Sequence, residues 1–417
     1  MPKQVIIIGG GIIGLCSAFY LQREGCEVTI VDKGDMNDGC SYGNAGYICP
    51  SHFVPLATPG IIKQGFKWML NSKSPFYIQP RISGDLINWG WKFMKSATQK
   101  HVDRSAVPLR DIALLSKRLY EEWTRLPGFD FSWEPKGLIE LFQTEKNAQH
   151  AVETVKQSLE LGLEAKVLSK DDVQKMHGDV PVNALGAIYF GCDVQVDPNR
   201  LMSDVKNWLT ARGVQFLTNY EVTGFTLANN KIEAITCSAG TLKADHFILA
   251  AGTWSRKIAQ QLQLTLPMVG GRGYSVTMYN QAYRFPLPVI LSEARVAISP
   301  MGNNKLRFGG TMEITGMQTP PRMNRVQGLL ESVQRFYPTY AIPMPPEEKV
   351  WYGYRPCSAD GLPYIGNSNK YKNFTIATGH SMLGLSLGAA TGKLTSELVL
   401  QQPASMDVKP FDAERFS

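Results

Sequence analysis

The sequence predicts an α/β fold class: a Rossmann-type nucleotide-binding domain, discontinuous in sequence, beside an α+β domain with a mixed sheet. An apolar strand runs into a glycine motif near the N-terminus, the composition changes near residue 55, and apolar strand patterns return near residue 245 and after residue 350. We expect the nucleotide-binding domain at residues 1–54, 195–262 and 350–417, and the second domain at residues 55–194 and 263–349.

The first predicted strand, residues 5–8, consists of four apolar β-branched residues, as is typical of a buried parallel strand. A glycine motif follows it directly and precedes a helical pattern. Its glycines allow a tight turn, close approach of the backbone to a pyrophosphate, and close packing of helix on strand. We therefore assign the cofactor site the residues Gly9, Gly11, Ile12, Ile13 and Gly14.

A second strand is predicted at residues 27–31 and ends at Asp32. In a dinucleotide site an acidic residue at this position accepts hydrogen bonds from the ribose hydroxyls. We include Asp32 and its neighbour Lys33 in the candidate cofactor site.

Between residues 55 and 190 prolines, tryptophans and charged helices replace the alternation of strands and glycine turns. Helical periodicity marks residues 109–126 and 148–161. A further helix is expected at residues 200–212, with Asn199 as its N-cap, and strands follow at residues 213–216 and 221–225.

Residues 245–255 read as an apolar strand that ends in small residues. From residue 264 to residue 349 we expect a second irregular block, in which residues 307–311 form the strand-like centre. The chain is thus expected to leave and re-enter the nucleotide-binding fold twice.

Composition excludes several classes of protein. The net charge of +7 over 417 residues is spread along the chain without a basic run, so we expect no nucleic-acid partner. Seven cysteines, an odd number without paired spacing, predict neither a disulfide framework nor a metal site and indicate a reducing compartment. No secretory signal or spanning segment is visible, so we expect a cytoplasmic protein that is soluble or peripheral to the inner face of the cytoplasmic membrane.

Four segments resemble the glycine oxidase and D-amino-acid oxidase family: residues 39–46, 245–255, 352–366 and 374–384. The overall pattern is most similar to the D-amino-acid dehydrogenase branch. The resemblance implies FAD as cofactor, with the second glycine-rich loop at the pyrophosphate, Val222 at the adenine, and the turn after residue 378 at the pyrimidine edge of the flavin. The cofactor residues that it implies are Cys40, Ser41, Asn44, Ala45, Gly46, Val222, Ala251, Gly252, Trp254, Gly379, His380, Met382, Leu383 and Gly384.

By the same resemblance Arg355 pairs with the substrate carboxylate, a task that suits a planar guanidinium. The competing interpretation is a structural salt bridge. Candidate polar groups of the substrate site are Tyr274, Tyr354, His52 and His380, for each of which packing or a backbone hydrogen bond is the competing role. Cys357 lies closer to Asp360 than the linking cysteine of covalent relatives does, so we expect FAD to be bound noncovalently. Arg272 and Met312 depart from the family pattern, so the resemblance does not define the pocket that would hold the substrate side chain.

The resemblance implies oxidative deamination of a small amino acid, most simply a D-amino acid, by hydride transfer from Cα to flavin N5. An imine and then a keto acid result, and the electrons pass to a quinone or another carrier. Three alternatives stay open: a D-proline or hydroxy-D-proline dehydrogenase, a glycine- or sarcosine-type oxidase that uses oxygen, and a flavin-binding subunit of a redox complex. A homo-oligomer is compatible with all of them.

Between residues 61 and 100 bulky apolar side chains are interleaved with cationic ones, the pattern of a segment that contacts a membrane surface. The competing interpretation is that they cover the core of the second domain. The apolar members are Ile61, Ile62, Phe66, Trp68, Met69, Leu70, Leu86, Ile87, Trp89, Trp91, Phe93 and Met94, and the cationic members are Lys63, Lys67, Lys73, Arg81, Lys92 and Lys95.

Overall fold

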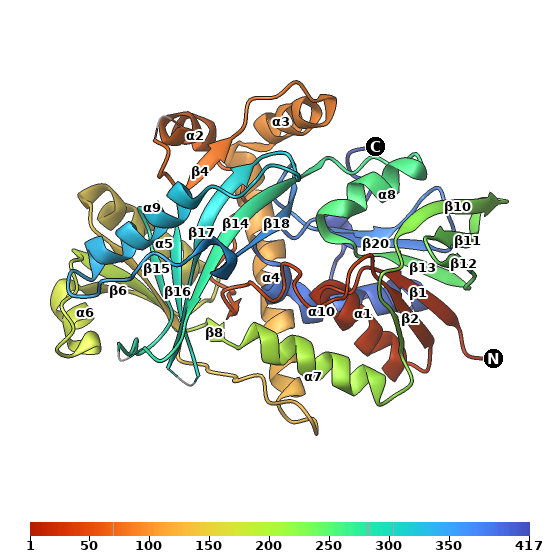
Figure 1. Ribbon diagram of the computed structural model, residues 1–417, viewed down its shortest axis with the longest axis horizontal. Helices are drawn as coiled ribbons and strands as arrows, with labels where there is room; N and C mark the ends of the chain where they lie inside the picture. Colours follow the sequence, from red (N-terminus) through yellow and green to blue (C-terminus); the bar gives the residue numbers. More distant parts are fainter. Residues whose placement is uncertain (70, 282, 303) are drawn as a thin grey trace.

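Two large sheets form the body of the protein, as the computed structural model shows (Figure 1). The model describes residues 1–69, 71–281, 283–302 and 304–417. A six-stranded sheet lies near both chain termini, and a nine-stranded mixed sheet forms the other half. The expected α/β fold, with a nucleotide-binding sheet that is discontinuous in sequence, is confirmed.

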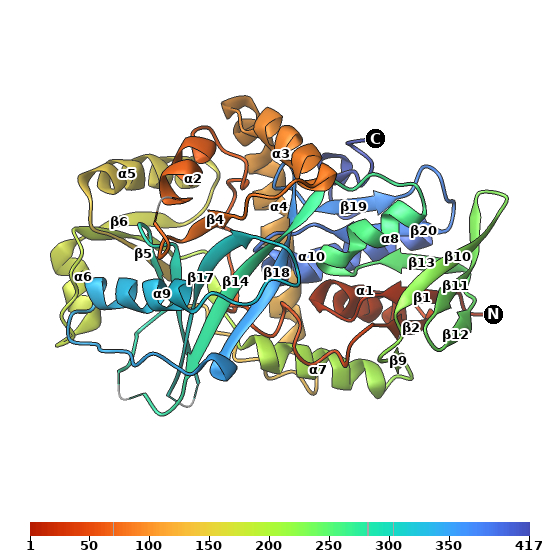
Figure 2. The same cartoon turned by 45° about the horizontal axis from the view of Figure 1, so that its top comes forward.

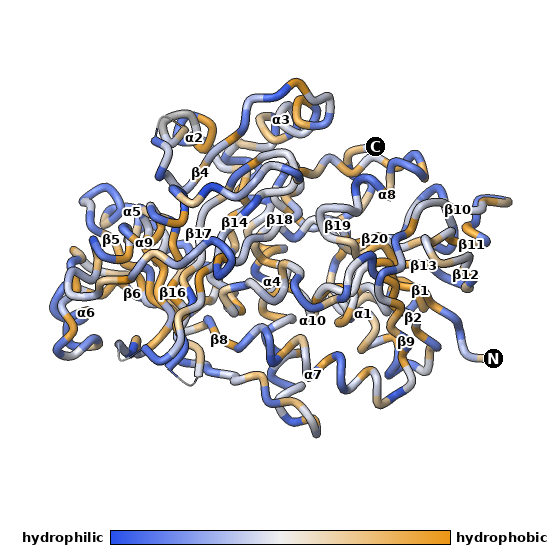
Figure 3. The backbone as a smooth tube through the Cα atoms, viewed as in Figure 1, coloured by the Kyte–Doolittle hydropathy of each residue, from blue (hydrophilic) through white to orange (hydrophobic). Residues whose placement is uncertain are grey.

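The six-stranded sheet has the order β19-β20-β13-β1-β2-β9 and is parallel except for β19. Ile7 belongs to the apolar cluster that contains helices α1 and α10, whereas Ile6 and Ile8 belong to the cluster that contains α8 and the small sheet β10-β11-β12. Both faces are therefore buried, which explains the unbroken apolar runs (Figure 3). The strands are β1 (Gln4–Ile8), β2 (Glu27–Val31), β9 (Gln215–Leu217), β13 (His246–Leu249), β19 (Tyr364–Asn367) and β20 (Phe374–Thr378), and the small sheet comprises β10 (Val222–Ala228), β11 (Lys231–Cys237) and β12 (Gly240–Leu242).

Helices α1 and α10 pack closely because small residues lie between them. A Cβ atom on Gly392 would stand 2.4 Å from the carbonyl carbon of Cys16, so glycine alone allows this approach. The long helix α4 also packs on α10, and its Tyr120 hydroxyl lies 3.8 Å from Cys16 Sγ of α1. The helices of this half are α1 (Ile12–Arg23), α4 (Gln99–Trp123), α7 (Pro198–Thr210), α8 (Ser255–Gln261) and α10 (Gly384–Leu400), with the short 3₁₀ turns η1 (Gly252–Trp254) and η3 (Lys409–Phe411).

Two helix boundaries differ from the sequence prediction. Helix α4 begins at Gln99, well before the expected residue 109, because its polar first turns and Pro108 hide the helical period. The expected N-cap of α7, Asn199, is wrong: Asp197 caps this helix by accepting hydrogen bonds from the Asn199 and Arg200 backbone amides, and Pro198 occupies the first turn.

The nine-stranded sheet has the order β18-β14-β17-β16-β15-β5-β7-β6, and β4 pairs with β17. It is mixed because β5–β15 and β4–β17 pair in parallel and the other neighbours are antiparallel. Its strands are β4 (Phe76–Ile78), β5 (Leu138–Phe142), β6 (Ala165–Ser169), β7 (Gly186–Phe190), β14 (Met268–Met278), β15 (Val289–Leu291), β16 (Val296–Met301), β17 (Lys305–Ile314) and β18 (Val350–Ser358). The helices of this half are α2 (Ile61–Met69), α3 (Gly84–Ser96), α5 (Glu145–Glu160), α6 (Lys170–His177) and α9 (Met323–Phe336), with the 3₁₀ turn η2 (Glu347–Lys349).

The expectation of an irregular block between residues 264 and 349 is wrong, since β14 and β17 are the two longest strands of the protein among the described residues. Glycines conceal the strand pattern. A Cβ atom on Gly271 would meet Met312 Sδ at 2.1 Å, and one on Gly273 would meet the Arg355 guanidinium at 2.2 Å. Because glycine has no side chain at these positions, larger side chains from the neighbouring strands can lie across the backbone of β14.

A two-stranded ribbon, β3 (Tyr47–Ile48) with β8 (Val194–Gln195), lies between the two halves. Hydrogen bonds from β17 support the segments on either side of this ribbon. Lys305 Nζ donates to Asp197 at 2.8 Å, and Arg307 Nη1 donates to the Tyr42 and Asn44 carbonyl oxygens at 2.8 and 2.7 Å. The nine-stranded sheet thereby holds the second glycine-rich loop in place.

Helices α2 and α3 lie together at one end of the nine-stranded sheet (Figure 2). The apolar residues of this segment divide between core and surface. Trp89 is buried and donates from Nε1 to the Cys357 carbonyl oxygen, whereas Ile87, Trp91 and Met94 are exposed. Leu70 and the side chains of Phe66 and Lys67 lie outside the described residues. Among the described helices, none is both long and apolar enough to cross a membrane.

Candidate cofactor and active site

A cavity of about 840 Å³ lies between the two sheets. Its lining includes Ile8 and Val31, where β1 and β2 end, and Ala250, directly after β13. The opposite wall includes Gly309 of β17 and Arg355 of β18. The carboxyl ends of parallel strands are the usual ligand site of such a sheet, and the volume suits a small-molecule ligand.

Most of the residues that the sequence proposes for the site line this cavity. Three do not: Gly14, Gly46 and Gly379. A Cβ atom on Gly14 would lie 2.0 Å from the Gly9 carbonyl oxygen, one on Gly46 would lie 2.2 Å from the Val196 oxygen, and one on Gly379 would lie 2.5 Å from the Tyr364 ring. These glycines therefore allow the close packing behind the residues that line the cavity. The lining residues are Gly9, Gly11, Ile12, Ile13, Asp32, Lys33, Cys40, Ser41, Asn44, Ala45, His52, Val222, Ala251, Gly252, Trp254, Tyr274, Tyr354, Arg355, His380, Met382, Leu383 and Gly384.

The glycine turn forms a cradle at the N-terminus of α1. Gly9 has a φ of 114°, and the Gly10 amide donates to Asp32 Oδ2 at 2.7 Å. The Ser41 hydroxyl accepts from the Ile12 amide at 3.0 Å, which brings the second glycine-rich loop to the same helix end. The N-cap residue, Gly11, carries no side chain, and a helix N-terminus next to glycines suits a pyrophosphate.

At one side of this cradle Lys33 Nζ lies 3.8 Å from the centre of the Trp254 ring. Val222 is part of the same cavity wall. An apolar strand residue and an indole ring that line the same cavity suit a flat aromatic base, and the Lys33 contact stabilises the ring.

A second helix N-terminus faces the cavity. Helix α10 begins after Leu383 without a side-chain cap, and Ser381 holds a positive φ of 51° in the preceding turn. His380 Nε2 lies 2.9 Å from the Thr391 hydroxyl, and burial lowers the pKa of His380 to about 3, so its ring is neutral at physiological pH. The helix dipole therefore supplies the positive potential at this end of the cavity. Two helix N-termini on one cavity fit a dinucleotide whose charged groups are well separated.

Arg355 is a cation that has no acidic partner in the part of the chain that the structure describes. Its Nη1 donates to the Thr311 carbonyl oxygen at 2.6 Å, and no carboxylate of the residues that the structure describes lies within 4.0 Å of its guanidinium. Burial lowers its pKa from the usual value, but the group stays charged. The salt bridge that competed with a ligand role is therefore absent from the described part of the chain.

Tyr354 is the strand neighbour of Arg355, so their side chains leave the sheet on opposite faces. The Tyr354 hydroxyl donates to the Met317 carbonyl oxygen at 2.8 Å. The Tyr274 hydroxyl donates to Glu313 Oε2 at 2.7 Å and accepts from the Arg322 amide at 2.8 Å. The structure thus brings the two tyrosine hydroxyls to a structural network and leaves Arg355 on the other side.

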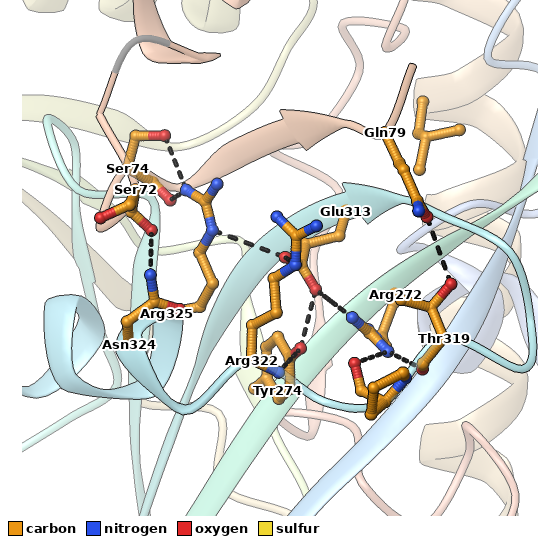
Figure 4. Close-up of polar contacts among 12 residues, drawn as sticks. Ser72, Ser74, Gln79, Arg272, Tyr274, Glu313, Thr319, Arg322, Asn324 and Arg325 are labelled. Carbon is orange, nitrogen blue, oxygen red and sulfur yellow. Dashed lines mark hydrogen bonds and ion pairs between the residues drawn. The ribbon is translucent and has the colours of Figure 1, made fainter. Parts of the chain in front are cut away.

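That network is centred on Glu313, which is fully buried among three arginines (Figure 4). Arg272 Nη2 lies 2.7 Å from Glu313 Oε2, and Arg325 and Arg322 lie 3.5 and 4.0 Å from Oε1. Arg272 also donates to the Thr319 and Pro320 carbonyl oxygens. Arg272, one of the two departures from the family pattern, therefore ties β14, β17 and the following loop together.

Sequence reasoning missed Arg307, although its position between Leu306 and Phe308 in a strand marks it as an unusual charge. It also missed Ser51 and Asp193, which bond to one another from segments far apart in the chain. Cys49, His52 and Asp193 form a compact group of possible metal ligands. We do not assign a metal to it, because Ser51 already donates to both oxygens of the Asp193 carboxylate.

The parallel sheet, the glycine cradle and the cavity between two sheets define a dinucleotide-dependent enzyme with a separate substrate-facing sheet. Comparison with known families specifies it further. Residues 4–398 match the DAO family, described as FAD dependent oxidoreductase, and the chain belongs to this family. The protein is therefore an oxidoreductase with FAD as its cofactor.

Individual relatives agree with this assignment. The chain is 28% identical over 414 residues to a D-amino acid dehydrogenase of Granulibacter bethesdensis, with 97% of each chain covered. It is 27% identical to a D-amino-acid oxidase of Bradyrhizobium diazoefficiens, with 99% of each covered. Glycine oxidase from Geobacillus kaustophilus has a similar fold, with a TM-score of 0.77 at 23% identity and 99% of each chain covered.

Proposed function

We propose that this protein is an FAD-dependent dehydrogenase of small D-amino acids, which yields an imine that hydrolyses to a keto acid. Bound FAD would supply the redox chemistry by accepting two electrons and a hydrogen from Cα. The dehydrogenase and oxidase names of the relatives favour a D-amino acid as substrate. The observation that carries the proposal is Arg355, a cation in the wall of the cofactor cavity that has no carboxylate partner among the described residues.

Arg355 would bind the substrate carboxylate. Thr311 accepts a hydrogen bond from Nη1, and glycine at position 273 leaves free the place in which the guanidinium lies. A guanidinium that is held by a carbonyl on one side can form two parallel hydrogen bonds with a carboxylate on another. Two-point binding orients Cα, and this orientation is the main contribution that the protein makes to the reaction.

The cofactor residues would act as the sequence proposes: the α1 cradle with Ser41 on the pyrophosphate, Asp32 on the ribose, Val222 and Trp254 near the adenine, and the α10 N-terminus on the flavin. We propose noncovalent binding, since Cys357 is buried outside the cavity lining, with its Sγ 3.5 Å from the Arg355 carbonyl oxygen and 3.9 Å from Met312 Sδ.

A substrate screen tests the proposal. The purified holoenzyme is offered a panel of D- and L-amino acids, glycine, sarcosine, D-proline and its hydroxylated forms, with a dye acceptor and with air. We expect dye reduction with one or more D-amino acids and little peroxide. Peroxide formed at a comparable rate would identify an oxidase, preference for a D-proline analogue would narrow the substrate, and no turnover of any amino acid would contradict the proposal.

We further propose that electrons pass to a membrane quinone and that α3 contacts the membrane surface. Ile87, Trp91 and Met94 share one side of α3, at spacings of four and three, and their exposed fractions are 64%, 55% and 47%. Lys95 Nζ lies 5.0 Å from the centre of the Trp91 ring. An apolar stripe with adjacent cations suits the headgroup layer of an anionic bilayer.

Flotation with vesicles of anionic lipid tests this surface. The wild type should float at low salt, and the double variant Ile87→Ser, Trp91→Ser should stay in the soluble fraction while it reduces the dye at the wild-type rate. Val152 and Leu159 are exposed apolar residues of α5 and provide the matched control, Val152→Ser with Leu159→Ser, which should float. A wild type that does not float, or a control that fails equally, would contradict a specific α3 contact.

A further inference from the structure

His52 lines the cofactor cavity and is connected to a buried carboxylate behind the cavity wall. Residues 49–53 follow β3 directly, and Asp193 directly precedes β8. Pairing of β3 with β8 joins these segments although Ser51 and Asp193 are 142 residues apart in the sequence. The Cys49 amide also donates to the Ser386 hydroxyl in the first turn of α10, which anchors the segment beside the second helix end of the cavity.

The hydrogen bonds have a single consistent direction. The Ser51 hydroxyl donates to Asp193 Oδ2 at 2.5 Å, and the Ser51 amide donates to Oδ1 at 3.1 Å. Because the Ser51 proton points to Asp193, the hydroxyl oxygen can only accept from His52 Nδ1, which lies 3.0 Å away. The neutral ring therefore carries its proton on Nδ1, and Nε2 holds a lone pair without a protein partner among the described residues.

The surroundings of this chain of bonds contain few other charges. Asp193 is 1% exposed, and burial raises its pKa, while His52 and the two Ser51 bonds oppose that rise. The thiols of Cys49 and Cys192 flank the carboxylate, and burial raises the pKa of both, so they stay protonated. Lys117 of α4 donates to the Cys192 carbonyl oxygen at 2.8 Å. A carboxylate oxygen of Asp193 thus lies within 4.8 Å of a ring nitrogen of His52.

We propose that His52 accepts a proton from the substrate ammonium, with Ser51 and Asp193 as the positioning residues that fix its tautomer. The inference rests on the proposed amino-acid substrate. The Nε2 lone pair forms a new N–H bond as one ammonium N–H bond breaks, so the amine becomes neutral and the imidazole becomes a cation. When the Cα–H bond then breaks, the hydrogen leaves with both electrons to the cofactor, and the amine lone pair forms the C=N bond.

In this arrangement Arg355 and His52 would bind different groups of the substrate. Both residues line the same cavity, in which Arg355 would bind the carboxylate and His52 would face the amine. A buried carboxylate behind the ring favours the imidazolium that forms, as in other acid–base pairs in which an acid orients a histidine.

The experiment compares kcat/KM of the holoenzyme between pH 7 and pH 10 for the wild type, His52→Gln, Asp193→Asn and Cys192→Ala. Cys192 contacts the Asp193 carboxylate but lies outside the path to His52, so Cys192→Ala is the matched control. The substrate is the amino acid with the highest dye-reduction rate in the screen. Binding of propionate, a carboxylate without an amine, is measured in parallel from the flavin absorbance.

We expect His52→Gln to lose roughly 100-fold in kcat/KM at pH 7, the usual contribution of a general base. The loss should shrink as the pH rises, because more substrate arrives with a neutral amine and needs no proton acceptor. Asp193→Asn should show a smaller loss with the same pH dependence, Cys192→Ala should follow the wild type, and all variants should bind propionate normally.

A loss that is the same at every pH, or a parallel loss of propionate binding, would make the chain of bonds structural and overturn this inference alone. Equal losses in Cys192→Ala and Asp193→Asn would overturn it as well. A wild type that oxidises no amino acid would overturn both this inference and the proposed function.

Discussion

Gly11 offers a test of the cofactor cradle that separates folding from binding. Its backbone, with φ −74° and ψ 179°, is extended and open to any residue. A Cβ atom there would meet only Ser41 Oγ, at an ordinary contact distance of 3.6 Å. Gly14 is different, since its Cβ would stand 2.0 Å from the Gly9 carbonyl oxygen.

The magnitudes follow from these distances. Gly11→Ala should leave the free energy of unfolding of the apoprotein within about 1 kcal/mol of the wild type, because the lost freedom of the unfolded chain and the poorer helix cap oppose one another. Its methyl group projects toward the pyrophosphate site and should weaken FAD binding by about 3 kcal/mol, roughly 100-fold in Kd. Gly14→Ala should destabilise the apoprotein itself by about 1–3 kcal/mol.

The assay measures FAD per protein after desalting, FAD affinity on reconstitution, and urea unfolding of the apoproteins. The expected result is a stable Gly11→Ala apoprotein with little FAD and a less stable Gly14→Ala apoprotein. Full retention of FAD by Gly11→Ala, with unchanged Kd, would refute the position of the pyrophosphate at this turn.

Three further predictions concern residues around the cavity. FAD should be released intact by acid from the wild type and from Cys357→Ser alike, and flavin that stays attached to the precipitated wild-type protein would contradict noncovalent binding. Glu313→Gln should lower the free energy of unfolding by about 3–5 kcal/mol in urea, because three arginines lose their buried counterion, and an unchanged midpoint would show that the network is dispensable. Arg307→Met frees the Tyr42 and Asn44 carbonyl oxygens and should weaken FAD binding at least about tenfold; unaltered affinity in a titration would show that the loop needs no support from β17.

The nucleotide-binding end of the fold could be predicted because its signals are local. Residues 5–32 contain a strand, a glycine turn, a helix and a second strand in direct succession, and each is marked by residues that are close together in the sequence. The position of Arg355 in the cavity wall could be predicted only through the family resemblance, because a single arginine in a strand gives no sequence pattern that indicates its role.

The rest depends on contacts between distant segments. The glycines of β14 look like turn residues until Met312 and Arg355 are seen to fill the space beside them. Asp197 and Asn199 are both good capping residues, and Pro198 decides between them by fixing the first turn. The bond from Ser51 to Asp193 has no local signal, because only the β3–β8 pairing brings the two residues together.

The most direct test of the account is the kinetics of Arg355→Met and Arg355→Lys with the best D-amino acid and a dye acceptor. If Arg355 binds the substrate carboxylate, kcat/KM should fall by about 3 kcal/mol or more in the Met variant, roughly 100-fold, while FAD content stays close to that of the wild type. The Lys variant should recover only part of the loss, because an ammonium cannot form the paired hydrogen bonds. Unchanged kcat/KM per bound FAD, with FAD itself lost, would make Arg355 a structural residue and contradict the account.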